Sequence, residues 1–429
     1  MRIKNPAFFW PLLFLSVSSC LRGSTPPSTA PTTLPTTGTL IPSLKPFDDL
    51  MLSFVQEHKI PAASLAVARN GHLVYARAFG YSNREQNEPA QPTSLFRIAS
   101  VSKPLTAVAI LQLVEQGKLN LTDKAFPLLN LQPPDGQQTN PQINDITVYQ
   151  LLTHTAGFDR DKSFDPMFRP IAIARLLGTD PPDQPEHIIR YMLPRPLDFP
   201  PGDRYAYSNF GYCVLGRIIE HISNQSYETY VQNHVLQPLG ITTMRIGHSL
   251  PDQKAPNEVS YYTPNNSTAP AVLGPNPGQK VPLPYGSWHH EALDAHGGFL
   301  ASAPDLVRFA SAFDDPATCK ILKPQSIALM FARPPGLAGF TPGNKPKDSF
   351  YALGWSVRPV ASSANTWHNG SLPGTASLLV RRHDGLTWAV LFNTDSTPTG
   401  QYIGSLIDPL LHQAADAVTQ WPTLELLNL

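Results

Sequence analysis

The chain has 429 residues, and its 32 Lys and Arg are balanced by 32 Asp and Glu, so the formal net charge is +0. That length is enough for one large domain or two ordinary ones with a sizeable core, and the lack of a basic stripe in the sequence argues against a nucleic-acid partner. The 46 prolines predict long, stiffened loops, but proline and glycine together stay below the level that marks a disordered chain.

We expect the N-terminal part of the chain to carry targeting and tether sequences. The basic start MRIK is followed by an apolar run too short to cross a membrane, which predicts a secretory signal over residues 1–19. The stretch ending at Cys20 looks like a bacterial lipobox, and this resemblance implies cleavage before Cys20 and lipid attachment to its sulfur. The alternative is an ordinary signal peptide whose last residue happens to be cysteine. Residues 20–44 are rich in Pro, Thr and Ser and are interpreted as a linker.

Residues 45–418 have the pattern of one α+β domain. Asn70-Gly71 between two strand-like runs is a strong hairpin signal, and strands return after residue 290, where His383-Asp384-Gly385 joins the last two. Strands at both ends of a helical middle predict an antiparallel sheet flanked by helices, with an inserted helical region. The α/β part is expected at about 45–110 and 290–418, the helical region at about 111–289, and a C-terminal tail at 419–429.

The sequence also supports predictions for several further segments. Residues 251–285 have little periodicity and are interpreted as a long surface loop that could act as a lid. Cys213 lies in an apolar helical pattern and is expected to be buried, while a disulfide between Cys213 and Cys319 is left open by the sequence. The predicted helices are 45–58, 100–114, 209–222, 227–236 and 401–418.

Ser100 precedes Lys103 by three residues, where a polar turn gives way to an apolar run. Residues three apart share one helix face, so the hydroxyl and the amine can meet. The field of a helix N-terminus, together with burial, lowers the pKa of a lysine, and a neutral Lys103 could take the proton of Ser100. Pro104 is tolerated only near a helix start and places the start here. The alternative is a capping serine followed by a lysine that extends to solvent.

A Tyr-x-Asn motif occurs twice. Tyr81-Ser82-Asn83 ends a strand and is interpreted as part of a turn, whereas Tyr207-Ser208-Asn209 opens a predicted helix. Tyr207 can act as an acid or a base if neighbouring positive charge lowers its pKa, and Asn209 can hold a substrate carbonyl or orient the lysine. The alternative for Tyr207 is a half-buried tyrosine beside a helix cap.

A His-x-Gly motif occurs three times, at the 383–385 hairpin turn, at His296-Gly297-Gly298 in a glycine-rich loop, and at His368-Asn369-Gly370. We expect His368-Asn369-Gly370 at the start of a strand. Glycines at 370 and 374 let a backbone approach closely, and an exposed strand edge there could bind an extended substrate through main-chain hydrogen bonds.

In this order the motifs resemble those of the serine β-lactamase and penicillin-binding-protein superfamily, over roughly residues 45–415. The pattern there is S-x-x-K, then Y-x-N, then K-T-G or H-x-G near the C-terminus. The sequence is most similar to class C β-lactamases, the related D-alanyl-D-alanine carboxypeptidases and family VIII carboxylesterases, with flanks such as LFRIASVSK and PPGDRYAYSNFGYCVLG. The sequence lacks the G-x-S-x-G elbow of an α/β-hydrolase.

The resemblance implies a β-lactamase/transpeptidase-like fold and a role for each matching residue. Ser100 would be the nucleophile. Lys103 would be its base, alone or together with Tyr207, and Tyr207 would protonate the leaving group. Asn209 would contact Lys103 and the substrate amide.

The third motif has further implied roles and two departures. His368 would orient Tyr207 or the substrate carboxylate, Asn369 and Gly370 would bind substrate, and the backbone N–H groups of Ser100 and Ser371 would form the oxyanion hole. His368 replaces the lysine common in β-lactamases, and Asn369 replaces the threonine. Histidine is a weaker cation at neutral pH and Asn369 lacks the hydroxyl, so both changes put efficient β-lactam hydrolysis in doubt.

Other histidines are expected to be structural. The stretch WHHEALDAH holds His289, His290, Glu291 and His296, but its spacing is not His-Glu-x-x-His. We therefore expect no metal site, and we expect no cofactor. His154 in LTHTAGF is interpreted as a loop histidine.

The sequence therefore predicts a serine hydrolase of the cell envelope, which acts through an acyl-Ser100 intermediate on an ester, peptide or lactam bond of a small-molecule or peptidoglycan-derived substrate. It would be exported and anchored to a membrane by the lipid at Cys20, on the periplasmic side. The alternative is a catalytically weak or silent module that binds peptidoglycan or another envelope partner. The sequence leaves the oligomeric state open.

Overall fold

The computed structural model describes residues 34–423 and 425–426. The predicted signal peptide and its Cys20 lie outside the described residues. Among the helices of the described part, none is both long enough and apolar enough to cross a membrane.

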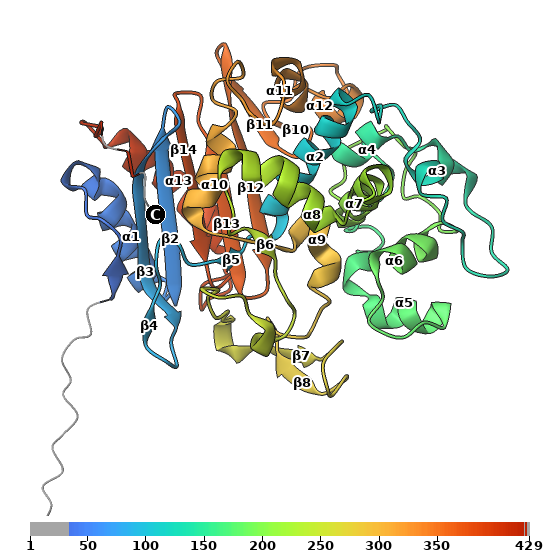
Figure 1. Cartoon of the computed structure of the whole chain (residues 1–429), viewed down its shortest axis with the longest axis horizontal. Helices are drawn as coiled ribbons and strands as arrows, with labels where there is room; N and C mark the ends of the chain where they lie inside the picture. Colours follow the sequence, from blue (N-terminus) through green and yellow to red (C-terminus); the bar gives the residue numbers. More distant parts are fainter. Residues whose placement is uncertain (1–33, 424, 427–429) are drawn as a thin grey trace, which may run out of the picture. The chain divides into compact units, whose positions relative to one another are not determined.

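A nine-stranded antiparallel sheet runs through the α/β part (Figure 1), in the spatial order β1-β3-β2-β14-β13-β12-β11-β10 with β4 beside β3. The N-terminal hairpin pairs with the C-terminal strand, as the α+β prediction requires. The predicted turn at Asn70 and Gly71 is present, and both residues have the positive φ of a tight hairpin turn, 50° and 82°. The strands are β1 (Thr36–Thr37), β2 (Ala62–Arg69), β3 (His72–Asn83), β4 (Glu88–Pro89), β10 (Phe350–Tyr351), β11 (Ser356–Val360), β12 (Ser363–Leu372), β13 (Thr375–Arg381) and β14 (Leu386–Phe392).

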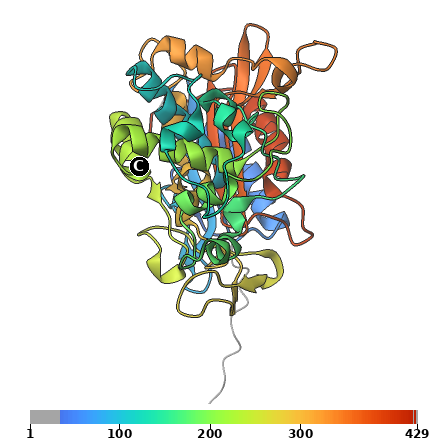
Figure 2. The same cartoon turned by 90° about the vertical axis from the view of Figure 1, so that its right-hand side faces the viewer.

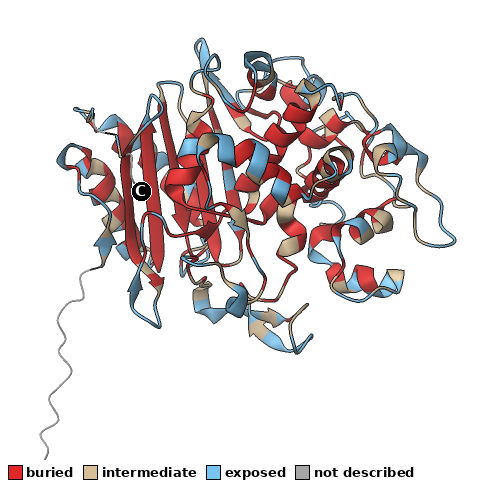
Figure 3. Ribbon diagram, viewed as in Figure 1, coloured by how far each residue is buried: buried red, intermediate tan, exposed pale blue. Residues whose placement is uncertain are grey.

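Helices cover both faces of this sheet. On one face, α1 (Lys45–Glu57) and α13 (Ile403–Asp416) pack against each other and bury an apolar cluster around Trp388. On the other face, α10 (Ala303–Ser311) contacts β2 and β14. The central strands are buried almost throughout (Figure 3), because apolar side chains on both of their faces meet helices.

The helical region faces the viewer in Figure 2. Its central helix is α2 (Lys103–Glu115), which is buried on nearly every side and packs against α7 (Asn209–Ser223). A small sheet, β5-β9-β6, joins this region to the nucleophile segment. The remaining elements include α3 (Ala125–Leu129), α4 (Val148–Leu152), α5 (Pro170–Leu177), α6 (Pro185–Met192), α8 (Tyr227–Val231), α9 (Asp294–Gly297), α11 (Pro324–Met330), α12 (Gly336–Gly339), β5 (Phe96–Arg97), β6 (Arg245–Ile246), β7 (Thr268–Pro270), β8 (Lys280–Pro282) and β9 (Phe299–Ala301).

The structure differs from the sequence-based prediction at three places. The predicted linker 20–44 is folded from residue 36 onward, because β1 pairs with β3 and the apolar side chains of Ile41 and Leu44 are buried. The motif 368–370 lies inside β12 rather than at the start of the next strand, since the polar run that precedes it also forms strand. The loop 251–285 contains the hairpin β7–β8.

Candidate active site

A short turn, η2 (Ala99–Ser102), holds half-buried Ser100 just before α2. Ala99 has a φ of 46°, a left-handed conformation that residues other than glycine rarely adopt and that is often found at functional sites. The hydroxyl of Ser102 donates to Ala99 O at 2.8 Å and accepts from the N–H of Phe299 at 3.3 Å. The turn is therefore locked to β9, and Ser100 is held in one place.

Lys103 is fully buried one helical turn after Ser100. Its Nζ lies 3.3 Å from Ser100 Oγ and donates to Asn209 Oδ1 at 2.8 Å and to the main-chain oxygen of His296 at 2.9 Å. Burial, with the positive charge of Arg160, holds the pKa of Lys103 well below its usual range. A neutral amine has two N–H groups and one lone pair. Because the two carbonyl oxygens take the N–H groups, the lone pair is left for the Ser100 hydroxyl.

Tyr207 lies directly before α7 with its ring against the amine of Lys103, 4.7 Å from Nζ to the ring centroid. Burial raises the pKa of Tyr207, and a hydrogen bond with Ser100 and the charge of Arg160 only partly oppose this. The condition set from the sequence, a pKa lowered by neighbouring charge, is not met, because loss of water around the phenol outweighs the nearby charge. Tyr207 therefore keeps its proton at neutral pH and suits a proton donor better than a base.

Asn209 connects the lysine to a half-buried carboxylate. While its Oδ1 accepts from Lys103, its Nδ2 donates to Asp165 Oδ2 at 2.7 Å. It is the first residue of α7, where the Ser208 hydroxyl accepts from the N–H of Gly211 and caps the helix. Asn209 thus orients the lysine, which is one of the two roles predicted for it. It also lines the cavity described below.

His368 lies near Tyr207, with ring centroids 6.5 Å apart, but its hydrogen bonds go to other groups. It is buried, its Nε2 pairs with the hydroxyl of Tyr351 at 2.9 Å, and its Nδ1 pairs with the main-chain oxygen of Asn369 at 2.7 Å. Since a carbonyl oxygen can only accept, Nδ1 carries the proton and Nε2 accepts from the tyrosine. Burial lowers the pKa of His368 to about 3. The ring is therefore neutral, which is unsuited to the predicted contact with a substrate carboxylate.

The end of β12 borders the nucleophile along an open edge. Strand β11 pairs only with residues 363–367, whereas β13 pairs with 366–372, so residues 368–372 have a strand partner on one side only. Gly370 packs so closely that a Cβ there would lie 2.2 Å from Ile98 O and 3.0 Å from Ser100 N. Ser371 then lines the same cavity as Ser100. Asn369 and Gly370, predicted as substrate contacts, do not line it; Gly370 instead sets the spacing between β12 and the nucleophile turn.

The cavity in front of Ser100 has a volume of about 550 Å³. Ser100, Asn209 and Ser371 lie on its wall, together with the apolar side chains of Trp288 and Leu372. Ala269 and Leu283 from the predicted loop also line it, so this segment covers one side of the site. The full lining is Ala99, Ser100, Arg160, Phe168, Asn209, Ala269, Leu283, Ser287, Trp288, Leu293, His296, Gly297, Ser371, Leu372, Pro373 and Asp395.

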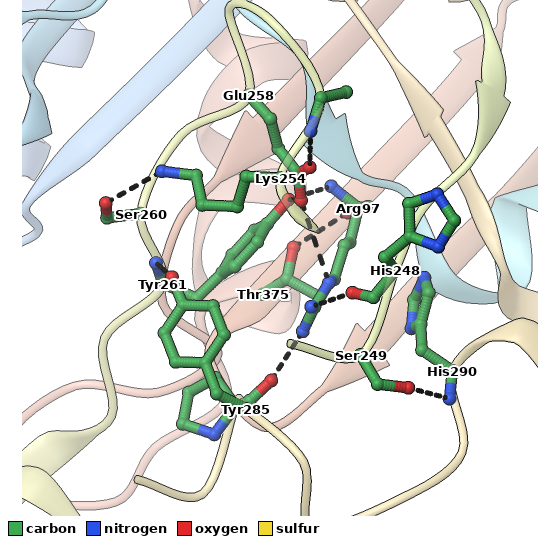
Figure 4. Close-up of polar contacts among 12 residues, drawn as sticks. Arg97, His248, Ser249, Lys254, Glu258, Ser260, Tyr261, Tyr285, His290 and Thr375 are labelled. Carbon is green, nitrogen blue, oxygen red and sulfur yellow. Dashed lines mark hydrogen bonds and ion pairs between the residues drawn. The ribbon is translucent and has the colours of Figure 1, made fainter. Parts of the chain in front are cut away.

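Arg97 holds that loop in place, three residues before Ser100 (Figure 4). Its buried guanidinium donates to Pro284 O at 2.6 Å and to His248 O at 2.7 Å, and it lies over the ring of Tyr261 at 4.4 Å. The carboxylate of Glu258, also buried, is 3.9 Å from Arg97 Nε and accepts from the Tyr261 hydroxyl. One cation thereby ties the loop wall of the cavity to the strand that leads into the nucleophile turn.

Three residues around the site had no catalytic or binding role assigned from the sequence. Asp165 contacts Asn209, and Arg160 lies over the ring of Tyr207 at 4.6 Å. Buried His154 packs against the rings of Tyr207 and Tyr351 at 4.4 and 4.5 Å. All three lie in the segment between α4 and α5, and no local pattern marks them. Only His154, in LTHTAGF, lies in a stretch that the family resemblance covered.

The remaining sequence-based expectations concern metal sites and cysteines. Within residues 34–423 and 425–426, no group of three or more His, Cys, Asp or Glu side chains is arranged to hold a metal ion. His289 and His290 instead pair with the main-chain oxygens of Asp183 and Gly298. Cys213 is buried as predicted, and Cys213 and Cys319 are both free thiols.

Comparisons with known proteins find similarity in sequence and in fold. One similar protein is Protein flp of Staphylococcus aureus (strain N315), which is 30% identical over 200 residues; the match covers 47% of this chain and 38% of that relative. The chain therefore spans about two fifths of that relative's length.

Solved structures show the same fold. The octameric penicillin-binding protein homologue from Pyrococcus abyssi superposes with a TM-score of 0.63 at 26% identity, covering 87% of this chain and 78% of that one. The D-amino acid amidase from Ochrobactrum anthropi SV3 has a TM-score of 0.65 at 20% identity, with 86% and 98% covered. The fold is β-lactamase/transpeptidase-like. The family model described as Beta-lactamase matches residues 47–409, and the chain belongs to this family.

Proposed function

We propose that the protein is a serine hydrolase that forms an acyl-enzyme on Ser100 and cleaves ester or amide bonds, the amides of peptides and lactams included. One observation carries this proposal. The buried amine of Lys103 has both N–H groups bound to carbonyl oxygens and lies 3.3 Å from Ser100 Oγ. A lysine held neutral beside a serine hydroxyl is a general base for nucleophilic attack.

The proposed reaction follows from these positions. Ser100 Oγ attacks the substrate carbonyl carbon while its proton passes to Lys103 Nζ, and the carbonyl oxygen takes the negative charge. Backbone N–H groups of Ser100 and Ser371 are the proposed donors to that oxygen. When the bond to the leaving group breaks, Tyr207 gives it a proton and recovers one from Lys103. A water molecule then attacks the acyl carbon and gives a proton to this pair, the bond to Ser100 Oγ breaks, and the pair returns the proton to Ser100 Oγ.

The motif His368-Asn369-Gly370 affects which substrates the site favours. His368 is neutral and turned toward Tyr351, so it supplies no cation where β-lactamases commonly have the K-T-G lysine. This supports simple esters and amides as better substrates than β-lactams. The open edge of β12 supports an acyl group that lies extended along that strand.

The experiment is hydrolysis of 4-nitrophenyl esters and of amino-acid 4-nitroanilides by the whole chain. We expect turnover that disappears in Ser100→Ala and persists in Ser287→Ala, a matched control, because Ser287 lines the same cavity but its hydroxyl donates to Leu283 O rather than pairing with Lys103. Turnover that survives in Ser100→Ala would refute the proposed nucleophile. No turnover of any ester or amide would favour the silent binding module instead.

We also propose export and lipid anchoring at Cys20, for which the sequence MRIK, the apolar run and the lipobox-like end are the support. The test is metabolic labelling with palmitate in a bacterial host, followed by membrane fractionation. Labelled, membrane-bound protein that becomes unlabelled in Cys20→Ser supports the anchor. Soluble, unlabelled wild-type protein in the periplasm would identify an ordinary signal peptide.

A further inference from the structure

We propose that Arg160 binds a carboxylate on the leaving group of the substrate and thereby sets the substrate preference of the site. The proposal rests on the proposed hydrolase function and deepens it, because it assigns substrate recognition to a residue outside the three motifs. Arg160 follows LTHTAGF and lies more than 200 residues before the H-x-G segment that the resemblance associated with recognition.

Arg160 lies at the end of the cavity that is next to Tyr207. Its guanidinium lies over the ring of Tyr207 at 4.6 Å, and it lines the same cavity as Ser100. Tyr207 is the proposed proton donor to the leaving group. A group that departs toward Tyr207 therefore passes beside Arg160, whereas the acyl group remains at Ser100.

The guanidinium is free to bind a ligand. Its side chain is 41% exposed, and its nearest acidic partner is Asp161, which is 90% exposed and 3.8 Å away. Across the described residues, the Arg160 side chain donates no hydrogen bond. Such an exposed pair is weak and readily exchanged, while the fork of N–H donors on arginine matches a carboxylate with two parallel hydrogen bonds.

The charges on the cavity wall favour an anion at this end only. His296 also lines the wall, but its burial keeps it neutral, and Lys103 is not part of the lining. Asp395 is the lining carboxylate, and its oxygens accept from the N–H of Gly374 and the hydroxyl of Ser396. An anionic substrate group is repelled by Asp395 and attracted by Arg160, which fixes the orientation of the substrate.

The test compares two esters of phenylacetylglycine, one with 3-hydroxybenzoate and one with 3-hydroxybenzamide as the leaving group. These leaving groups have nearly the same size and differ in one negative charge. We expect kcat/KM of wild type to favour the carboxylate ester, and Arg160→Gln to lower that preference about 10- to 100-fold, the range of a charge-assisted hydrogen bond pair. The ratio is the readout because Arg160 also lowers the pKa of Lys103, an effect that changes both esters alike.

The chain offers a matched control in Arg169, which is exposed and lies over the ring of Phe164 at 4.7 Å but does not line the cavity. Arg169→Gln should leave the ratio unchanged, and added salt should reduce the wild-type ratio. Equal kcat/KM for the two esters in wild type, or an unchanged ratio in Arg160→Gln, would overturn the proposal.

A second measurement separates this proposal from the proposed function. Binding of 3-hydroxybenzoate and 3-hydroxybenzamide to the Ser100→Ala variant needs no turnover and can be followed by calorimetry. Tighter binding of the carboxylate that is lost in Ser100→Ala/Arg160→Gln supports the role of Arg160 even if no ester is hydrolysed. Equal affinities for the two compounds would overturn it, whatever the activity.

Discussion

Gly370 sets the distance between β12 and the nucleophile turn. Gly370→Ala should therefore lower kcat/KM strongly, although it adds only one methyl group. The added Cβ would lie 2.2 Å from Ile98 O, 2.4 Å from Ser377 Oγ and 3.0 Å from Ser100 N. Ordinary contacts between carbon and oxygen are about 3.3 Å, so the strand and the turn must separate by about 1 Å. The Ser377 hydroxyl, which donates to Ile98 O at 2.6 Å, is also displaced.

The expected losses of activity and of stability follow from that shift. A displacement of about 1 Å between reacting groups lowers the rate about 10²-fold, and overpacking of a close-packed site costs about 1–3 kcal/mol of folding free energy. The assay is kcat/KM with a 4-nitrophenyl ester, together with thermal unfolding. The matched control is Gly297→Ala, because a Cβ at this cavity-lining position meets nothing closer than 3.8 Å. Gly370→Ala with activity within threefold of wild type and an unchanged Tm would refute the reasoning.

Four further predictions concern buried ionisable groups. Lys103→Met should lower kcat/KM about 10³-fold by removing the base, with the fold retained by circular dichroism. Wild-type kcat/KM should rise with pH through the lowered pKa of Lys103, as a pH profile will measure, because only the neutral amine accepts the serine proton. The pKa of His368, about 3 when folded against 6.5 when unfolded, means that the unfolded state binds more protons between these values. Stability should therefore fall as pH drops below about 6.5, with a contribution from His368 of up to roughly 5 kcal/mol. His368→Gln should reduce this dependence in urea unfolding, while buried His154, His290 and His296, whose pKa values are also lowered, keep the rest. Arg97→Met leaves the buried carboxylate of Glu258 without its cation, which should cost about 3–5 kcal/mol and speed proteolysis within 251–285.

Each of these has a clear contrary result. Full activity in Lys103→Met, or a flat kcat/KM profile from pH 5 to 9, would exclude the lysine as the base. An equal loss of stability in acid for wild type and His368→Gln would mean that His368 is not the responsible group. Unchanged proteolysis in Arg97→Met would show that the loop is held by other contacts.

The part of the site that is local in the sequence could be predicted. Ser100 and Lys103 are three residues apart across the start of α2, so their proximity follows from helical spacing. The start of α7 at Asn209 could also be predicted, but its contact with Lys103 depends on the packing of α2 against α7. The hairpin at Asn70 and Gly71 could likewise be read from turn chemistry.

The rest depends on tertiary contacts that no local pattern carries. Asp165 and Arg160 reach the site from loops, and the neutral state of His368 follows from burial beside Tyr351. The folded end of the predicted linker also depends on a tertiary contact, because β1 forms by pairing with the edge of β3.

The acyl-enzyme on Ser100 is tested most directly by mass spectrometry of the whole chain after rapid acid quenching during turnover of a phenylacetylglycine ester, with benzylpenicillin as a second reagent. We expect a mass increase equal to the acyl group on the peptide that contains Ser100. This increase should be absent in Ser100→Ala and should form much more slowly in Lys103→Met. Turnover without any acylated Ser100, or with the acyl group on another residue, would contradict the proposed mechanism.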